Sequence, residues 1–292
     1  MFVRILLLFL ILAAGYLGLG VLVVLGMTSP RRGRPEATPA SVGLAYEEVE
    51  VRSTDGVRLS AWWVPAEGSS QAAVLVPGWG GSKSDEHVLL TAPVYNQAGY
   101  GVLTFDPRAQ GESEGGRRTL GYREVRDVLG ALVWLRKRGY ETGDVVLHGW
   151  SMGGAMVMRA APGMGVAAVV EEAGYADLPL LLGVKIPEVI RFGELLKPTI
   201  LLAGRLFPDF DAWAVRPQRE AAELYKEGVP LFVIHSTGDE LVPYEHAAML
   251  AAAHPGARVW KLEGYGHVEA CEHPEYGRRL MELLKTSRDN GW

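Results

Sequence analysis

Two copies of the pattern Gly-x-Ser-x-Gly occur in the sequence, around Ser113 and around Ser151, and each could present a serine nucleophile. A serine on the sharp turn between a buried strand and a helix can attack a carbonyl carbon and form an acyl-enzyme. Ser151 has this context, because an apolar run precedes it and a helical pattern follows it. Ser113 stands between Glu112 and Glu114, whose carboxylates would oppose a developing oxyanion. Ser151 is therefore the predicted nucleophile, and Ser113 is predicted to be a loop residue.

After such a serine, the expected chain order is an acid and then a histidine that acts as the base. His267 follows the last predicted strand in a glycine-rich segment that can place an imidazole over the edge of a sheet. Asp239 directly follows Gly238 in the loop before that strand and is favoured over Glu240 as the acid; its alternative role is an Asx turn. The other histidines are expected to pack locally (His87, His148, His235), to lie on a helix surface (His246), or to occupy turns and helix starts (His254, His273).

Two main-chain N–H groups are needed to stabilise the tetrahedral oxyanion. One is expected from Met152, directly after the nucleophile, and the other from Trp79 in the glycine-rich segment 77–81. This segment is not a dinucleotide fingerprint, because Lys83 replaces the third glycine. No zinc-binding spacing connects the possible ligands near the C-terminus, which are His267, Glu269, Cys271 and His273. We therefore expect no cofactor and no metal ion.

A mostly parallel sheet is predicted to position these residues. Short apolar runs alternate with helical patterns, the clearest of which cover residues 120–138 and 274–286. This alternation predicts an α/β fold with helices on both faces of the sheet, and ligands in such sheets bind at the carboxyl ends of the strands. The eight predicted strands are residues 46–52 and 57–65, which form a hairpin, and residues 72–76, 101–105, 144–147, 166–170, 230–234 and 258–262.

The N-terminus is predicted to be a transmembrane anchor. Residues 5–27 contain no charged side chain, and 23 helical residues would span about 34 Å, enough to cross a hydrocarbon core of about 30 Å. We expect an anchor at residues 1–27, a linker at 28–44 and a catalytic domain at 45–292. A cleaved signal peptide is the alternative. More Arg residues follow the segment than precede it, which favours a cytoplasmic catalytic domain, but the side of the membrane stays open.

The overall composition excludes several classes of protein. Of the 29 basic residues, Arg4, Arg31, Arg32 and Arg34 lie in the first 34 residues, whereas all 34 acidic residues follow them. The domain is therefore acidic and is not expected to bind nucleic acid. Cys271 is the only cysteine, so the chain cannot form an internal disulfide. The oligomeric state is left unpredicted.

Five segments together resemble the α/β-hydrolase superfamily, in particular bacterial membrane-anchored esterases or peptidases of the prolyl-oligopeptidase-like clan. They are PGWGG at 77–81, FDPRAQGESEG at 105–115, HGWSMGG at 148–154, HSTGDELVPYEH at 235–246 and EGYGHVEA at 263–270. The resemblance implies a triad of Ser151, Asp239 and His267, with the oxyanion hole at Trp79 and Met152. Two departures are Pro77, where many members have His, and Ala109, where a glycine is common.

Residues 175–224 leave the predicted sheet as an apolar, helix-like insertion interrupted by prolines. In the superfamily that the chain resembles, such an insertion is typically a lid over the active site. Its apolar character, with Trp150 and Tyr175 as candidate lining residues, predicts a hydrophobic acyl-binding pocket. The alternative is that the insertion packs as part of the core.

These observations predict a membrane-tethered serine hydrolase that cleaves carboxylic esters through an acyl-Ser151 intermediate. The substrate is expected to be a small acyl ester or a short peptide. A peptidase or amidase with the same triad is the first alternative, and a non-catalytic membrane interaction module is the second.

Overall fold

The computed structural model describes residues 1–206 and 210–289, and it is built around an eight-stranded sheet with the order β10-β9-β8-β7-β4-β5-β3-β2. Strand β3 is antiparallel to β2 and β5, and the remaining neighbours are parallel. The eight strands are β2 Glu47–Arg52, β3 Arg58–Val64, β4 Ala72–Val76, β5 Gly101–Phe105, β7 Val145–Trp150, β8 Ala168–Glu172, β9 Leu231–Ser236 and β10 Arg258–Leu262. The predicted α/β-hydrolase fold with a mostly parallel sheet is confirmed.

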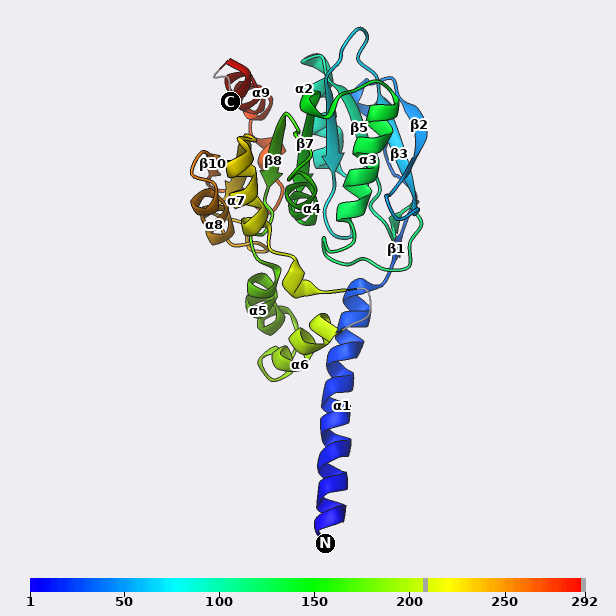
Figure 1. Ribbon diagram of the computed structural model, residues 1–292, viewed down its shortest axis with the longest axis vertical. Helices are drawn as coiled ribbons and strands as arrows, with labels where there is room; N and C mark the ends of the chain where they lie inside the picture. Colours follow the sequence, from blue (N-terminus) through cyan, green and yellow to red (C-terminus); the bar gives the residue numbers. More distant parts are fainter. Residues whose placement is uncertain (207–209, 290–292) are drawn as a thin grey trace.

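Helices cover both faces of this sheet (Figure 1). One apolar cluster includes side chains of α3, α4, α7 and α8, and the other includes side chains of α2 and α9. Alternate residues of β4 supply the two clusters, as expected for a strand that is buried on both faces. The helices of this domain are α2 Glu86–Gln97, α3 Val125–Lys137, α4 Met152–Ala160, α7 Pro217–Glu227, α8 Glu245–Ala253 and α9 Tyr276–Asp289, with short 3₁₀ turns at Pro39–Val42, Thr142–Asp144, Ala212–Ala214 and Ala270–Glu272.

Helix α3 begins later than the sequence predicted, and strand β8 ends later. Helix α3 starts at Val125, not at residue 120, because Leu120 and Gly121 have positive φ angles of 48° and 81° that a right-handed helix excludes. Strand β8 ends on Glu171 and Glu172, which are both buried. Sequence patterns assign such acidic residues to loops, which is why the predicted strand ended at residue 170.

The segment around Ala109 takes a conformation that favours glycine. Ala109 has a φ of 60° and is fully buried, so alanine occupies the left-handed region at the position where the resemblance has glycine. The neighbouring strand β6 (Gln110–Gly111) pairs with β1 (Arg31–Arg32), which joins the segment after the N-terminal helix to the domain that contains the eight-stranded sheet.

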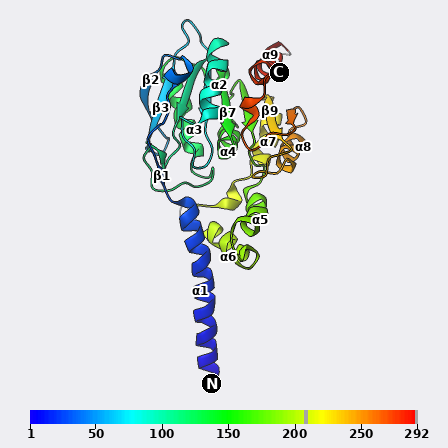
Figure 2. The same cartoon turned by 180° about the vertical axis from the view of Figure 1, so that it is seen from behind.

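Helix α1 (Phe2–Thr28) extends away from the sheet, and the insertion lies beside its upper part (Figures 1 and 2). Its length and apolar composition suit a membrane span, and a signal sequence can have the same length and composition. The insertion contains α5 (Leu178–Val189) and α6 (Gly193–Leu206), and α6 packs against α1. The domain boundaries at residues 27, 44, 175 and 224 stay predictions.

Candidate active site

Ser151 occupies a strained turn between β7 and α4. Its φ and ψ angles are 55° and −120°, a combination that costs a non-glycine residue on the order of 1–3 kcal/mol. A Cβ atom on Gly149 would lie 2.1 Å from the oxygen of Gly153, and one on Gly153 would lie 2.0 Å from the oxygen of Val76. Both glycines of the pattern are therefore required by close backbone contacts. The Ser151 N–H donates to the oxygen of Glu172 at 2.8 Å, which ties the turn to β8.

The predicted acid and base are in direct contact. Asp239 follows β9 and His267 follows β10, and Nδ1 of His267 lies 2.7 Å from Oδ2 of Asp239. The other oxygen, Oδ1, accepts the N–H groups of Leu241 and Val242 at 2.9 and 2.8 Å. Since β7, β9 and β10 run in the same direction within one sheet, Ser151, Asp239 and His267 come from the same edge of that sheet.

A second histidine contacts the same carboxylate. His235, which the sequence analysis assigned to local packing, is buried, and its Nε2 lies 3.4 Å from Oδ2 of Asp239 and 2.8 Å from the oxygen of Val242. Although burial alone would raise the pKa of Asp239, hydrogen bonds with His235 and His267 hold it well below its usual range. Asp239 therefore stays ionised at neutral pH. The spacing of four residues between His235 and Asp239 is the feature of the sequence that could have indicated this contact.

The loop after β4 passes directly over the nucleophile. A Cβ atom on Gly78 would lie 3.1 Å from Cβ of Ser151, closer than most Cβ contacts, so glycine favours this approach. Gln110 braces the loop from both sides: its Nε2 donates to the oxygen of Gly78 at 3.1 Å, and its Oε1 accepts the Gly80 N–H. No local pattern in the sequence connects Gln110 to this loop, so its role could not be predicted. Trp79 lies between the two braced glycines.

Met152 begins α4, immediately after Ser151, and its side chain is buried. Amide groups in the first turn of a helix have no acceptor within the helix, so the Met152 N–H is available to a ligand. The side chain of Trp79, in contrast, is 43% exposed, and its indole Nε1 donates to the oxygen of Met27 in α1 at 3.2 Å.

The two candidate pocket residues lie in the core, on opposite faces of the sheet. Trp150 is fully buried in the cluster with α2 and α9 and stacks on His148, with ring centroids 4.0 Å apart. Tyr175 belongs to the other cluster, and its hydroxyl donates to the oxygen of Leu120 at 2.9 Å. Their role in a substrate pocket stays a prediction.

A buried carboxyl network lies under the Ser151 turn. Oε2 of Glu172 accepts the Tyr276 hydroxyl at 2.9 Å and lies 3.3 Å from Nε2 of His148. Burial raises the pKa of Glu172 to about 8 and lowers that of His148 to about 3. Both side chains are therefore predominantly neutral at pH 7, and the network holds the strand whose oxygen accepts the Ser151 N–H.

Several other predicted residues have structural contacts. The Ser113 hydroxyl donates to the oxygen of Asp106 at 2.5 Å and accepts the Ser60 N–H at 2.9 Å, so this serine braces a loop. The prediction that His246 lies on a helix surface is wrong: this face of α8 packs against the start of the insertion, where His246 is buried and its Nδ1 accepts the Ala176 N–H at 3.2 Å. Among residues 1–206 and 210–289, no three metal-ligating side chains gather at one point.

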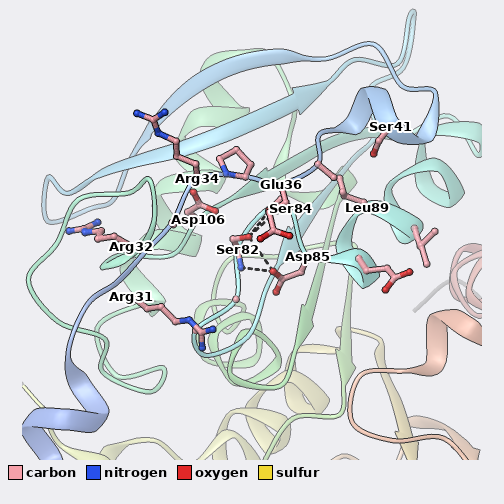
Figure 3. A pocket seen from close by; sticks show the side chains of 18 of the residues that line it. Arg31, Arg32, Arg34, Glu36, Ser41, Ser82, Ser84, Asp85, Leu89 and Asp106 are labelled. Carbon is pink, nitrogen blue, oxygen red and sulfur yellow. Dashed lines mark hydrogen bonds between the residues drawn. The ribbon is translucent and has the colours of Figure 1, made fainter.

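A cavity of about 720 Å³ lies next to the braced loop, under the segment that follows α1 (Figure 3). Arg31 and Arg34 line it from that segment, and Gly80, Ser82 and Asp85 line it from the other side. Ser151, Asp239 and His267 do not belong to its lining. It is therefore separate from the candidate catalytic residues.

Comparisons with known proteins agree with this fold. The model of the alpha/beta hydrolase family matches residues 73–277. The lysophosphatidylserine lipase ABHD12 of Macaca fascicularis is 26% identical over 245 residues, a match that covers 77% of this chain and 59% of that protein. The chain thus spans less than two thirds of the length of this relative. An uncharacterised protein of Mycobacterium tuberculosis is 29% identical over 86% of this chain and 82% of its own length.

Solved structures of esterases share the same architecture. The Pyrococcus furiosus esterase Pf2001 aligns with a TM-score of 0.72 and 23% identity over 88% of this chain and 98% of that chain. Est1E from Butyrivibrio proteoclasticus aligns with a TM-score of 0.60 and 18% identity over 83% of this chain and 98% of that chain. At these identities the likeness concerns the fold.

Proposed function

The chain belongs to the alpha/beta hydrolase family, and on that premise we propose that it is a hydrolase that cleaves carboxylic esters through an acyl intermediate on Ser151. The observation that carries the proposal is the 2.7 Å contact between His267 and Asp239 at the sheet edge where the Ser151 turn also lies. This contact leaves Nε2 of the imidazole to act on a serine hydroxyl. The exposed fraction of the His267 side chain, 20%, also leaves it within reach of a water molecule.

In the proposed reaction, Oγ of Ser151 attacks the ester carbonyl carbon while Nε2 of His267 takes the hydroxyl proton. The carbonyl oxygen becomes an oxyanion that the N–H groups of Trp79 and Met152 stabilise. Collapse of this intermediate breaks the bond to the alcohol, which receives the proton from His267. A water molecule then repeats the sequence on the acyl-serine, and the acid leaves with Ser151 restored. Asp239 holds the imidazole in the required tautomer.

The test is a comparison of Ser151→Ala with Ser113→Ala, the serine of the other Gly-x-Ser-x-Gly segment. Ser151→Ala is expected to abolish labelling by a fluorophosphonate and to lower the turnover of short p-nitrophenyl esters by about 10⁴-fold or more. Ser113→Ala is expected to retain labelling, provided that a melting curve shows a folded protein. Labelling that persists in Ser151→Ala would overturn the assignment.

Peptide or amide cleavage by the same residues is the second candidate, because the proposed chemistry applies to amides as well as to esters. A parallel measurement of kcat/KM on acyl esters and on dipeptide amides separates the two. Because the relative ABHD12 is named a lysophosphatidylserine lipase, this comparison should also include a lysophospholipid ester.

We also propose that α1 is retained as a single-pass membrane anchor. Its C-terminal end is bonded to the catalytic domain: the Arg118 N–H donates to the oxygen of Thr28 at 2.9 Å, and the Trp79 indole donates to that of Met27. Cleavage of a signal peptide after Thr28 would remove these acceptors. The intact mass of the protein purified from membranes tests this proposal, since a cleaved chain would lack the first residues.

A further inference from the structure

Helices α5 and α6 and the turn between them carry large apolar side chains on their surface. Val189 is 72% exposed, and Phe192 and Leu195 are each 67% exposed. The exposed set comprises Leu180, Val184, Val189, Phe192, Leu195, Leu202 and Leu206. Such a concentration of apolar surface in one short segment is characteristic of a surface that binds a partner or a membrane.

This apolar surface lies next to α1. Oγ1 of Thr199 in α6 donates to the oxygen of Tyr16 at 3.0 Å, and a Cβ atom on Gly20 would lie 2.4 Å from the oxygen of Thr199. The Tyr16 hydroxyl also donates to the oxygen of Leu195. Close backbone approach at a small residue, joined by hydroxyl hydrogen bonds, is typical of helix pairs within membranes. Figures 1 and 2 both show α6 beside the upper part of α1.

The length of α1 determines where this surface must lie. The uncharged run of α1, residues 5–27, follows Arg4 and spans about 34 Å at 1.5 Å per residue. A bilayer has a hydrocarbon core of about 30 Å. If α1 spans the bilayer, the core takes about 20 residues of this run and therefore includes Tyr16 and Gly20, which contact α6. The exposed apolar side chains of α6 then lie within the same leaflet.

Two ion pairs of the insertion fit this placement. Glu194 and Lys197 form an ion pair of 3.0 Å within the first turn and a half of α6, and Lys185 and Glu188 form one of 2.6 Å in α5. Paired charges cost less at a membrane interface than single ones, and long side chains can extend toward the headgroups. Directly after α1, Arg31, Arg32 and Arg34 are exposed and place positive charge near the end of the helix, where it favours anionic lipids, while Arg31 and Arg34 also line the cavity described above.

The edge of the sheet that carries Ser151 lies on the side of the domain from which α1 and the insertion extend. The loop after β4 is bonded to Met27 at the end of α1, and α5 follows β8 at its carboxyl end. We propose that α5 and α6 form a second membrane-binding element that inserts its apolar face into the leaflet next to the catalytic domain. This proposal rests on the proposed esterase function and anchor, and it deepens them: the substrate is an acyl ester drawn from that leaflet.

The depth of the α6 side chains can be measured without any activity. In a full-length Cys271→Ser background, Leu195→Cys and Val189→Cys carry a fluorophore, and Val133→Cys on α3, whose native valine is 45% exposed, is the control. The protein is reconstituted in phosphatidylcholine vesicles that contain nitroxide lipids labelled either on the headgroup or on the acyl chain. We expect acyl-chain nitroxides to quench the labels at positions 195 and 189 and to leave the label at 133 unquenched.

Two results would overturn the proposal. Quenching of the labels at 195 and 189 by aqueous iodide alone would place this face in water. Protection from both lipid and aqueous quenchers would show that another protein surface, such as a second copy of the chain, covers it. Because neither result depends on hydrolysis, failure of the proposed esterase function would leave the depth measurement intact.

A second measurement tests the origin of the substrate. The double variant Val189→Asn/Leu195→Asn is expected to hydrolyse a long-chain acyl ester in vesicles about tenfold more slowly, because insertion loses two large apolar side chains. Its turnover of a soluble short-chain ester should stay within about twofold of the unmodified protein, as should that of Val133→Asn on both substrates. Equal loss on both substrates, or no loss on vesicles, would contradict delivery from the leaflet.

Discussion

The indole Nε1 of Trp79 donates a hydrogen bond to the main-chain oxygen of Met27, 3.2 Å away. Trp79 belongs to the loop that passes over Ser151, and Met27 is the second-to-last residue of α1. The guanidinium of Arg118 packs over the same indole ring at 4.5 Å. The apolar N-terminal helix is therefore bonded directly to the loop in which we place one oxyanion donor.

Trp79→Phe is expected to lower kcat severalfold without abolishing activity. The substitution removes one hydrogen bond, worth about 1 kcal/mol, and keeps both the main-chain N–H and a ring under Arg118. Trp134→Phe on α3, where Arg138 packs over the ring at 4.2 Å, is the matched control and should leave kcat unchanged. Steady-state kinetics on a soluble ester measure both. An equal loss in the two variants would show that the effect comes from general destabilisation.

Asp239→Asn is expected to lower kcat by about 10³–10⁴-fold with little change in KM, because an amide cannot hold the imidazole of His267 in the required tautomer. Glu240→Gln changes the adjacent exposed carboxylate and should retain activity within about twofold. The comparison directly tests the choice between the two acids. A larger loss in Glu240→Gln than in Asp239→Asn would contradict our assignment.

Gly153→Ala is expected to disrupt the Ser151 turn and to destabilise the domain by several kcal/mol, because the new methyl group would meet the oxygen of Val76 at 2.0 Å. Gly116→Ala is the control, since a Cβ atom there has no neighbour within 4 Å. Its stability should change by about 0.5 kcal/mol or less. Thermal unfolding in detergent, followed by near-UV circular dichroism, measures both. A Gly153→Ala protein with unchanged melting temperature would show that the turn is less tightly packed than the structure indicates.

Glu172→Gln is expected to reduce the pH dependence of stability. Burial raises the pKa of Glu172 from 4.5 to about 8, so the unfolded chain releases this proton at lower pH than the folded one. The contribution of the neutral carboxyl is fully present below pH 4.5 and is lost as the pH rises to 8, by up to about 1.4 kcal/mol per pH unit.

Melting temperatures at pH 5 and pH 8 test this expectation. The unmodified protein should lose more stability across the interval than Glu172→Gln, in which residue 172 does not titrate. Burial also raises the pKa of Glu171 to about 7. This residue therefore maintains part of the pH dependence of stability in both proteins. Glu240→Gln serves again as the control with an exposed carboxylate and should behave as the unmodified protein does. Parallel curves for Glu172→Gln and the unmodified protein would show that Glu172 is ionised in the folded state.

Features that depend on residues close together in the chain could be predicted from the amino-acid sequence alone. Short apolar runs between helical patterns predicted six strands of the sheet, because strands buried on both faces are apolar throughout, and a turn signal between alternating residues predicted the hairpin of β2 and β3. The turn at Ser151 was also predictable, since Gly149 and Gly153 lie where backbone contacts exclude any side chain. The order of Ser151, Asp239 and His267 along the chain pointed to one edge of that sheet.

Contacts between side chains that are far apart in the sequence could be identified only from the folded structure. Gln110 reaches the loop over Ser151 across 30 residues of sequence, and His235 turns toward Asp239, where the sequence indicated only local packing. Tertiary burial also decided that Glu172 belongs to a strand, against the tendency of an acidic residue to lie in a loop. The contact between α6 and α1 joins segments that no local pattern relates. Such contacts depend on how complete elements pack together, and their free energy is absent from any short stretch of the chain.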